Sequence, residues 1–230
     1  MKRAGNHDWT TNERDSFGVG PFNAYQSTLN IQPVIPISVT KEWNIITRTI
    51  LPVESWPAIR SDAYVVGIGD TMFTAFLSPA NPGKFVWGVR PAFLFPTASS
   101  SELGSGEWGL GPSIVGLYMG KKIVAGALLN NIWSFAGWGD KSVNAMTLQP
   151  FINYNFPGGW YLTFSPIITA NWIESAGNFW TVPLGGGFGK VVHFGKLPVN
   201  LSMQFFGYAV TPENGPTWSF RLQCQFLFPK

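Results

Sequence analysis

Trp218-Ser-Phe-Arg-Leu-Gln-Cys-Gln-Phe-Leu-Phe228 is the stretch that decides the fold, because apolar and polar residues alternate along most of its length. In an extended chain this pattern makes one face apolar and leaves Ser219, Arg221 and Gln223 on the other. A strand of roughly 10 residues with aromatic ends is long enough to cross a hydrocarbon layer at a tilt. Since a single strand cannot satisfy its backbone in lipid, the stretch predicts a closed barrel.

The composition favours sheet over helix. Charged residues make up only 12% of the chain, whereas a soluble domain has about 25%. No run of about 18 apolar residues occurs, so no transmembrane helix is predicted. The net charge is +3, and the basic residues are too scattered to form a nucleic-acid footprint. We expect no nucleic-acid partner, and composition alone leaves a soluble all-β domain open.

The same period-two pattern continues toward the amino terminus and defines about 11 candidate strands. The clearest are residues 160–172, 144–156 and 199–209. Weaker ones are residues 28–37, 43–52, 69–78, 85–95, 108–118, 123–135 and 180–191. Because bacterial barrels have an even number of strands, a twelfth is expected around residues 15–22, unless residues 1–22 form a plug in the lumen. We predict an all-β, up-and-down antiparallel transmembrane barrel of about 12 strands, with residues 1–230 as one domain.

The connections between the predicted strands fall into two classes. One class is short and carries lysine: Lys41, Lys84, Lys121, Lys122, Lys190, Lys196 and Lys230. The other is mostly longer and carries acid: Glu54, Asp62, Glu102, Glu107, Asp140, Glu174 and Glu213. Glu42, Arg60 and Lys141 are exceptions to this separation. Short turns of such barrels face the periplasm, so the acidic rim is expected to be extracellular.

Proline conflicts with this picture. Each proline inside a strand removes a hydrogen-bond donor from the ladder, and a closed barrel has no free edge to accommodate it. Bulges or interrupted pairing would resolve the conflict. Six prolines lie inside predicted strands: Pro33, Pro91, Pro112, Pro150, Pro166 and Pro183.

Several stretches resemble motifs of a known protein family, and they occur in the order expected for that family. They begin at Thr28-Leu-Asn-Ile-Gln-Pro, Trp43-Asn-Ile-Ile-Thr-Arg, Phe76-Leu-Ser-Pro, Trp108-Gly-Leu-Gly-Pro-Ser, Trp133-Ser-Phe-Ala-Gly, Trp180-Thr-Val-Pro-Leu and Phe226-Leu-Phe-Pro-Lys. The sequence from about residue 17 to 230 resembles the MetA-pathway phenol-degradation family of bacterial outer-membrane, transporter-like barrels. The resemblance implies a barrel related to channels for hydrophobic compounds. That family has another strand-like segment ahead of the match, where this chain has the hydrophilic residues 1–15.

Catalytic chemistry finds no support in the sequence. His7 and His193 are the two histidines, and neither lies in a Ser/His/Asp arrangement or at metal-ligand spacing. The single Cys224 lies on the apolar face of the last strand, so no disulfide is expected. We predict no enzyme activity, no catalytic residues, no metal site and no cofactor.

The informative polar residues are those that alternation points inward. Arginine on the lipid face would cost roughly 2–4 kcal/mol at the midplane, which favours a position in the lumen. The charges can neutralise one another, with Asp70 between Arg48 and Arg90, or form a constriction with surplus positive charge that orients phenolates or carboxylates. The predicted lumen set is Arg48, Asp70, Arg90, Glu107, Arg221, Asn30, Gln32, Gln149 and Gln223.

Tryptophans fall near the ends of the predicted strands, as interfacial girdles in contact with outer-membrane lipid require. These are Trp43, Trp87, Trp108, Trp133, Trp160, Trp172 and Trp180.

Three functions are compatible with the sequence. The first is passive passage of small hydrophobic or aromatic compounds across the bacterial outer membrane through a narrow lumen. The others are a structural or adhesive barrel with a blocked lumen, and a soluble lipocalin-like carrier. Export needs a signal peptide, and residues 1–14 contain no apolar core of that kind, so we expect that the signal peptide was removed or that the start of the sequence is displaced. The oligomeric state is left open.

Overall fold

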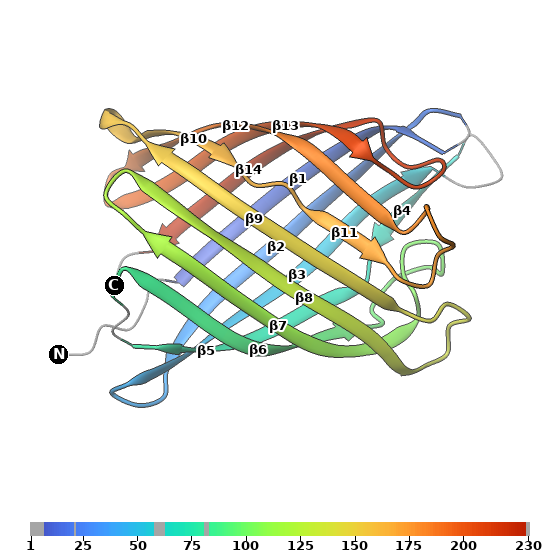
Figure 1. The fold of residues 1–230 in the computed structure, drawn as a ribbon, viewed down its shortest axis with the longest axis horizontal. Coiled ribbons are helices and arrows are strands. Elements are labelled where there is room, and N and C mark those ends of the chain that lie inside the picture. Colours follow the sequence, from blue (N-terminus) through green and yellow to red (C-terminus); the bar gives the residue numbers. More distant parts are fainter. Residues whose placement is uncertain (1–6, 21, 58–62, 81–82, 229–230) are drawn as a thin grey trace.

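The computed structural model describes residues 7–20, 22–57, 63–80 and 83–228, which form one antiparallel sheet closed on itself (Figure 1). Twelve positions make up the wall. They are β1 (His7–Val19), β2 (Ala24–Ser38), β3 (Trp43–Pro57), β5 (Thr71–Pro79), β6 (Phe85–Phe95), β7 (Glu107–Met119), β8 (Ile123–Gly137), β9 (Asn144–Asn155), β10 (Trp160–Phe164) with β11 (Ile168–Asn171), β12 (Trp180–Phe194), β13 (Leu197–Val210) and β14 (Trp218–Phe228). The prediction of an all-β, up-and-down barrel of about 12 strands is confirmed.

Two short elements accompany the twelve wall positions. β4 (Tyr64–Ile68) pairs with the end of β3 and lies off the closed path. The 3-10 turn η1 (Pro157–Gly159) connects β9 to β10. Among the described residues, no helix is long and apolar enough to span a membrane.

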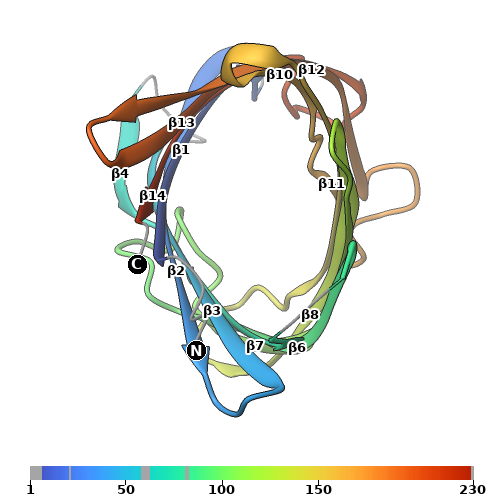
Figure 2. The same ribbon diagram turned by 90° about the vertical axis from the view of Figure 1, so that its left-hand side faces the viewer.

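The barrel closes between β1 and β14, which pair without a break from His7 opposite Phe228 to Phe17 opposite Trp218. Figure 2 shows the strands as a complete ring. The twelfth strand therefore begins earlier in the chain than the expected 15–22. β1 also forms part of the wall, which excludes a plug made of residues 7–19.

The predicted strand 160–172 is wrong as a continuous element, because it is interrupted between β10 and β11. β10 pairs with β9 up to Phe164 opposite Ile152, and pairing resumes at Ile168 opposite Leu148. Alternation persists across the break, since Thr163, Ser165 and Thr169 all line the lumen. Pro166 is fully buried at the break.

The proline conflict is resolved by local interruptions of the ladder. Each strand residue directs its N–H to one neighbour, so a proline is tolerated where that side is unpaired. Pro91 faces Pro112 across β6 and β7, and their other sides fall in gaps toward β5 and β8. Pro33 adjoins a gap between β2 and β3, and Pro183 lies at a register shift. Pro150 and Pro166 lie at the break between β10 and β11.

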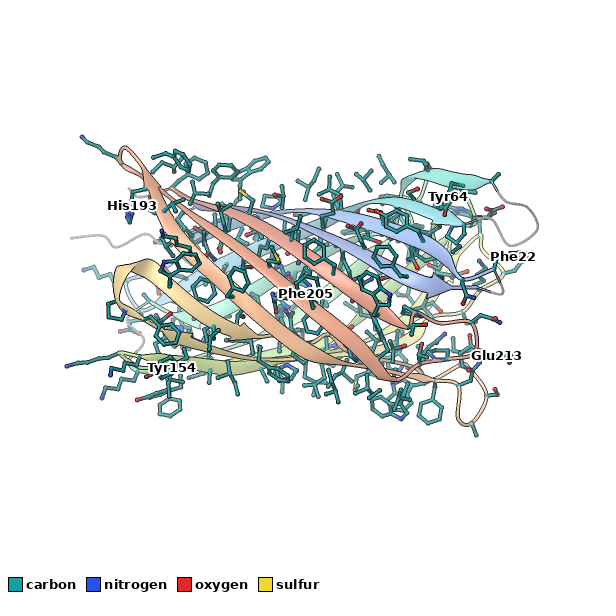
Figure 3. All side chains as sticks on the ribbon, turned by 90° about the horizontal axis from the view of Figure 1, so that it is seen from above. Phe22, Tyr64, Tyr154, His193, Phe205 and Glu213 are labelled. Carbon is teal, nitrogen blue, oxygen red and sulfur yellow. The ribbon has the colours of Figure 1, made fainter. Side chains whose placement is uncertain are left out.

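The two ends of the barrel differ. One end, called here the turn end, carries the short turns, the start of β1 and the end of β14; the opposite loop end carries most of the longer connections (Figure 1). Figure 3 shows Tyr154 and His193 at the turn end, Phe205 midway along the barrel, and Tyr64 and Glu213 at the loop end. Phe205 is 52% exposed, so a large apolar side chain lies on the outer surface at mid-length.

Candidate functional site: the barrel lumen

The inner face of the wall encloses two adjoining cavities, because polar side chains alternate inward along the strands. One, of about 380 Å³, lies toward the turn end and includes Phe151, Asn153 and Tyr161 among its lining residues. The other, of about 330 Å³, lies toward the loop end and is lined by polar, charged and apolar side chains. We call them the turn-end cavity and the loop-end cavity. Both are lined by Asn12, Gln32, Arg48, Leu128 and Gln149.

The shared residues mark the junction of the two cavities. Arg48 on β3 donates a hydrogen bond from Nη2 to Oε1 of Gln32 on β2, at 2.5 Å. Gln149 on β9 donates from Nε2 to Oγ of Ser165 at 3.0 Å. Anything that moves between the cavities therefore passes Arg48, Gln32 and Gln149.

Arg90 and Arg221 are both held by neutral groups in the wall. Arg90 is 6% exposed and donates from Nε to Oγ of Ser113 at 2.9 Å and from Nη1 to Oγ1 of Thr74 at 2.6 Å. Arg221 on β14 donates from Nη1 to the carbonyl oxygen of Ser165, which lies in the break between β10 and β11, at 2.9 Å. These contacts orient each guanidinium group without neutralising its charge.

Aromatic rings support the same two arginines. The guanidinium carbon of Arg90 lies 3.5 Å from the ring centre of Phe76, and that of Arg221 lies 4.8 Å from that of Phe206. A cation over a ring face is attracted by the negative π surface, most strongly where water is excluded. Both aromatic residues point inward, so part of the lumen's aromatic surface is used to hold arginines.

Asp70 is bound to a loop, so it does not take the position between Arg48 and Arg90 that was one of the two arrangements left open by the sequence. Loop 96–106 connects β6 to β7, and its Ala98 N–H donates to Oδ1 of Asp70 at 3.2 Å. The N–H and Oγ–H of Ser105 donate to Oδ2 at 2.7 and 2.8 Å. At Gly104, an added Cβ would lie 2.6 Å from Oδ1 of Asp70, so the close approach of this loop requires glycine. Asp70 therefore fixes loop 96–106 beside the loop-end cavity.

Two charged residues of the lumen were not predicted. Glu54 was expected in an outer connection, but it lies in β3 and lines the loop-end cavity, where its buried Oε2 has no hydrogen-bond partner among the described residues. Arg14 lies in β1 and lines the same cavity. The signal that would have located β1 is the pair Trp9 and Phe17, which share one face at the spacing of the two girdles.

The other predicted lumen residues are placed as follows. Asn30 lines the loop-end cavity, and Gln223 lines the turn-end cavity. Glu107 is 9% exposed at the first residue of β7, and it is not among the residues that line either cavity. The structure thus brings Arg48, Asp70, Arg90 and Arg221 to the loop-end cavity and leaves Glu107 at its rim.

The outer surface carries aromatic residues at both ends. Trp43 and Trp87 meet edge to face at the turn end, with ring centres 6.4 Å apart, and Trp160 lies at the same end. At the loop end, Trp172 and Trp180 meet at 5.5 Å, while Trp108 and Trp133 are 40% and 46% exposed. Two aromatic belts separated by an apolar band are the pattern of a barrel that crosses a membrane.

One strand departs from this outward pattern. Because Asn12 and Arg14 line the lumen, Glu13 between them points to the outer face, where it is exposed opposite Leu222 and Leu29. Asp15 also faces outward, and Oδ1 accepts a hydrogen bond from the hydroxyl of Tyr25 at 2.6 Å. The rule that strand charges point inward therefore fails on β1.

Comparison with known proteins supports the fold. No family model and no curated protein sequence matches the chain. Among solved structures, it is similar to the COG4313 outer membrane channel from Pseudomonas putida F1, with 16% identity and a TM-score of 0.73 over 99% of this chain and 96% of that one. It is also similar to the NanC porin, with 12% identity and a TM-score of 0.56 over 97% and 100%.

A third similar structure is the CymD monoaromatic hydrocarbon channel, with 10% identity and a TM-score of 0.50 over 100% of this chain and 89% of that one. The fold is that of an outer-membrane β-barrel. Together with the two aromatic belts, it assigns the chain to the bacterial outer membrane.

Proposed function

We propose that the barrel is an outer-membrane channel for the passive passage of small hydrophobic or aromatic compounds, related to the MetA-pathway phenol-degradation family. The observation that carries the proposal is the pair of adjoining lumen cavities, of about 380 and 330 Å³, which have residues of the junction in common. A closed cavity of roughly 150 Å³ is enough to hold benzene. Each cavity therefore has room for a single-ring solute.

The lining supports solutes that combine a ring with a polar group. Phe151 and Tyr161 line the turn-end cavity among Asn and Gln side chains, and Ile50 and Met72 contribute apolar surface to the loop-end cavity. The CymD channel is described as conducting monoaromatic hydrocarbons, and its fold is similar to this one. The family resemblance stated from the sequence points in the same direction.

A structural barrel with a blocked lumen is the second candidate, and one observation favours it. Loop 96–106 is held to Asp70, and Leu103 within it is only 3% exposed, so this connection is packed rather than extended into solvent. The soluble carrier is excluded, because the large exposed side chains of the outer face are apolar while most residues that line the turn-end cavity are polar.

Electrical recording separates the two candidates. Purified barrel is reconstituted into planar bilayers, and Leu128→Trp is compared with Leu129→Trp. Leu128 lines both cavities, whereas Leu129 is 37% exposed and belongs to the outer face. We expect discrete conductance steps that Leu128→Trp reduces at least about twofold and Leu129→Trp leaves unchanged, because a larger ring narrows the junction. Electrical silence of the folded wild-type barrel would overturn the proposal.

A further inference from the structure

Arginines outnumber carboxylates among the residues that line the loop-end cavity. Four arginines line it, Arg14, Arg48, Arg90 and Arg221, against two carboxylates, Glu54 and Asp70. Both oxygens of Asp70 already accept hydrogen bonds from loop 96–106. The cavity therefore holds more cationic groups than its own acids balance.

Most guanidinium donors in the cavity are not used by the protein. A guanidinium group has five N–H donors. Arg48 and Arg221 each donate one hydrogen bond and Arg90 donates two, all to neutral oxygens. Among the described residues, none accepts a hydrogen bond from the Arg14 guanidinium group, although Glu54 in the same cavity interacts with it electrostatically. Donors in a fixed planar fork match the two oxygens of a carboxylate.

Arg14 and Arg221 are also direct cross-strand partners. They oppose each other in the β1–β14 ladder, and both side chains line the loop-end cavity. Like charges placed directly opposite are unfavourable. An anion between them would relieve that repulsion. The Phe206 ring beneath Arg221 and the bond to Ser165 hold one of the two groups in place before any anion arrives.

Apolar side chains adjoin this pair. Ile50, Met72, Leu94 and Ile167 line the same cavity. They provide a surface for the ring of a solute whose acidic group contacts the arginines.

We propose that Arg14 and Arg221 form a carboxylate-binding subsite, so that the channel's substrate class is small aromatic monocarboxylates. Arg48 and Arg90 extend the positive surface toward the junction. The assignment of a transported substrate class rests on the proposed channel function. Binding of a carboxylate by the two arginines does not require that the barrel conducts.

Calorimetric titration of the full chain in neutral detergent tests the subsite. The probes are benzoate, acetate and benzyl alcohol, which carry the ring and the carboxylate, the carboxylate alone, and the ring with a neutral group. We expect benzoate to bind at least about tenfold more tightly than either of the others, since a charge-assisted hydrogen bond is lost with the alcohol and apolar contact is lost with acetate. Equal binding of benzoate and benzyl alcohol would overturn the subsite, and equal binding of benzoate and acetate would overturn the aromatic part.

Single substitutions test whether benzoate binds at the proposed carboxylate-binding subsite. Arg14→Gln should weaken benzoate binding by about tenfold and leave benzyl alcohol unchanged. It removes no hydrogen bond to a described residue, so it is preferred to Arg221→Gln, which releases the contact to Ser165. Lys122→Gln removes the same charge from an exposed turn and should have no effect. Undiminished benzoate binding in folded Arg14→Gln would refute the assignment.

Bilayer recording under a salt gradient distinguishes failure of the subsite from failure of the channel. A wild-type barrel that conducts with a preference for chloride over potassium, reduced in Arg14→Gln, supports both. Conductance without a preference for chloride would support the proposed channel function and would contradict the carboxylate-binding subsite. Benzoate binding that depends on Arg14, in a barrel that does not conduct, would support the carboxylate-binding subsite and would contradict the proposed channel function.

Discussion

Replacement of Glu13 by leucine should stabilise the barrel in a bilayer. Glu13 faces outward in β1, midway between Trp9 and Phe17 on the same face. At about 3.3 Å per residue and a tilt near 40°, these aromatics are about 20 Å apart along the membrane normal. Glu13 then lies about 10 Å from each belt, close to the midplane, between Leu29 and Leu222.

The expected gain in the free energy of unfolding depends on how deep residue 13 lies in the membrane. Arginine or lysine on the lipid face costs roughly 2–4 kcal/mol at the midplane, and aspartate or glutamate costs less. We therefore expect Glu13→Leu to raise the free energy of unfolding by about 1–2 kcal/mol, and Glu13→Gln to recover part of that gain by removing only the charge. Asp15→Leu should gain nothing, because Asp15 lies nearer the belt and accepts the Tyr25 hydrogen bond.

The assay is reversible urea unfolding from phospholipid vesicles, with the midpoints of the four proteins compared at a common m-value. If Glu13→Leu and Glu13→Gln leave the midpoint unchanged or lower it, the carboxylate does not face hydrocarbon. The placement of β1 in the membrane wall would then be refuted.

Three further outcomes are expected. Asp70→Ala removes three hydrogen bonds to loop 96–106 and should increase conductance fluctuations in planar bilayers, while Asp140→Ala in an exposed loop should not. Gly187→Ala would bring a Cβ into the carbonyl oxygen of Met203 on β13 and should lower the free energy of unfolding in urea by about 1–3 kcal/mol, whereas Gly207→Ala, with open space around its Cβ, should be neutral. Cys224 lies on the outer face with Leu222, so a water-soluble maleimide should label it only after unfolding from vesicles; rapid labelling of the folded barrel would contradict a lipid-facing position.

Much of the wall could be predicted from local sequence. Alternation predicts β14 and β6 to the residue, because each has a continuous apolar face and a turn or loop on either side. It fails at β1, whose outer face carries Glu13 and Asp15. That strand belongs to the wall because β2 and β14 pair with it on both sides and close the ring, and closure is a property of the whole barrel.

In the lumen, too, some features follow from the sequence and others only from the tertiary structure. The sequence by itself determined which side of most strands meets lipid, since side-chain direction alternates with every residue whatever the neighbouring strand. Only the tertiary structure decided which inward groups meet: Arg14 lies opposite Arg221 because the first strand pairs with the last, and Asp70 holds loop 96–106 instead of an arginine. Periodicity carries information about one strand at a time, whereas these contacts join residues far apart in the chain through the register in which the sheet closes.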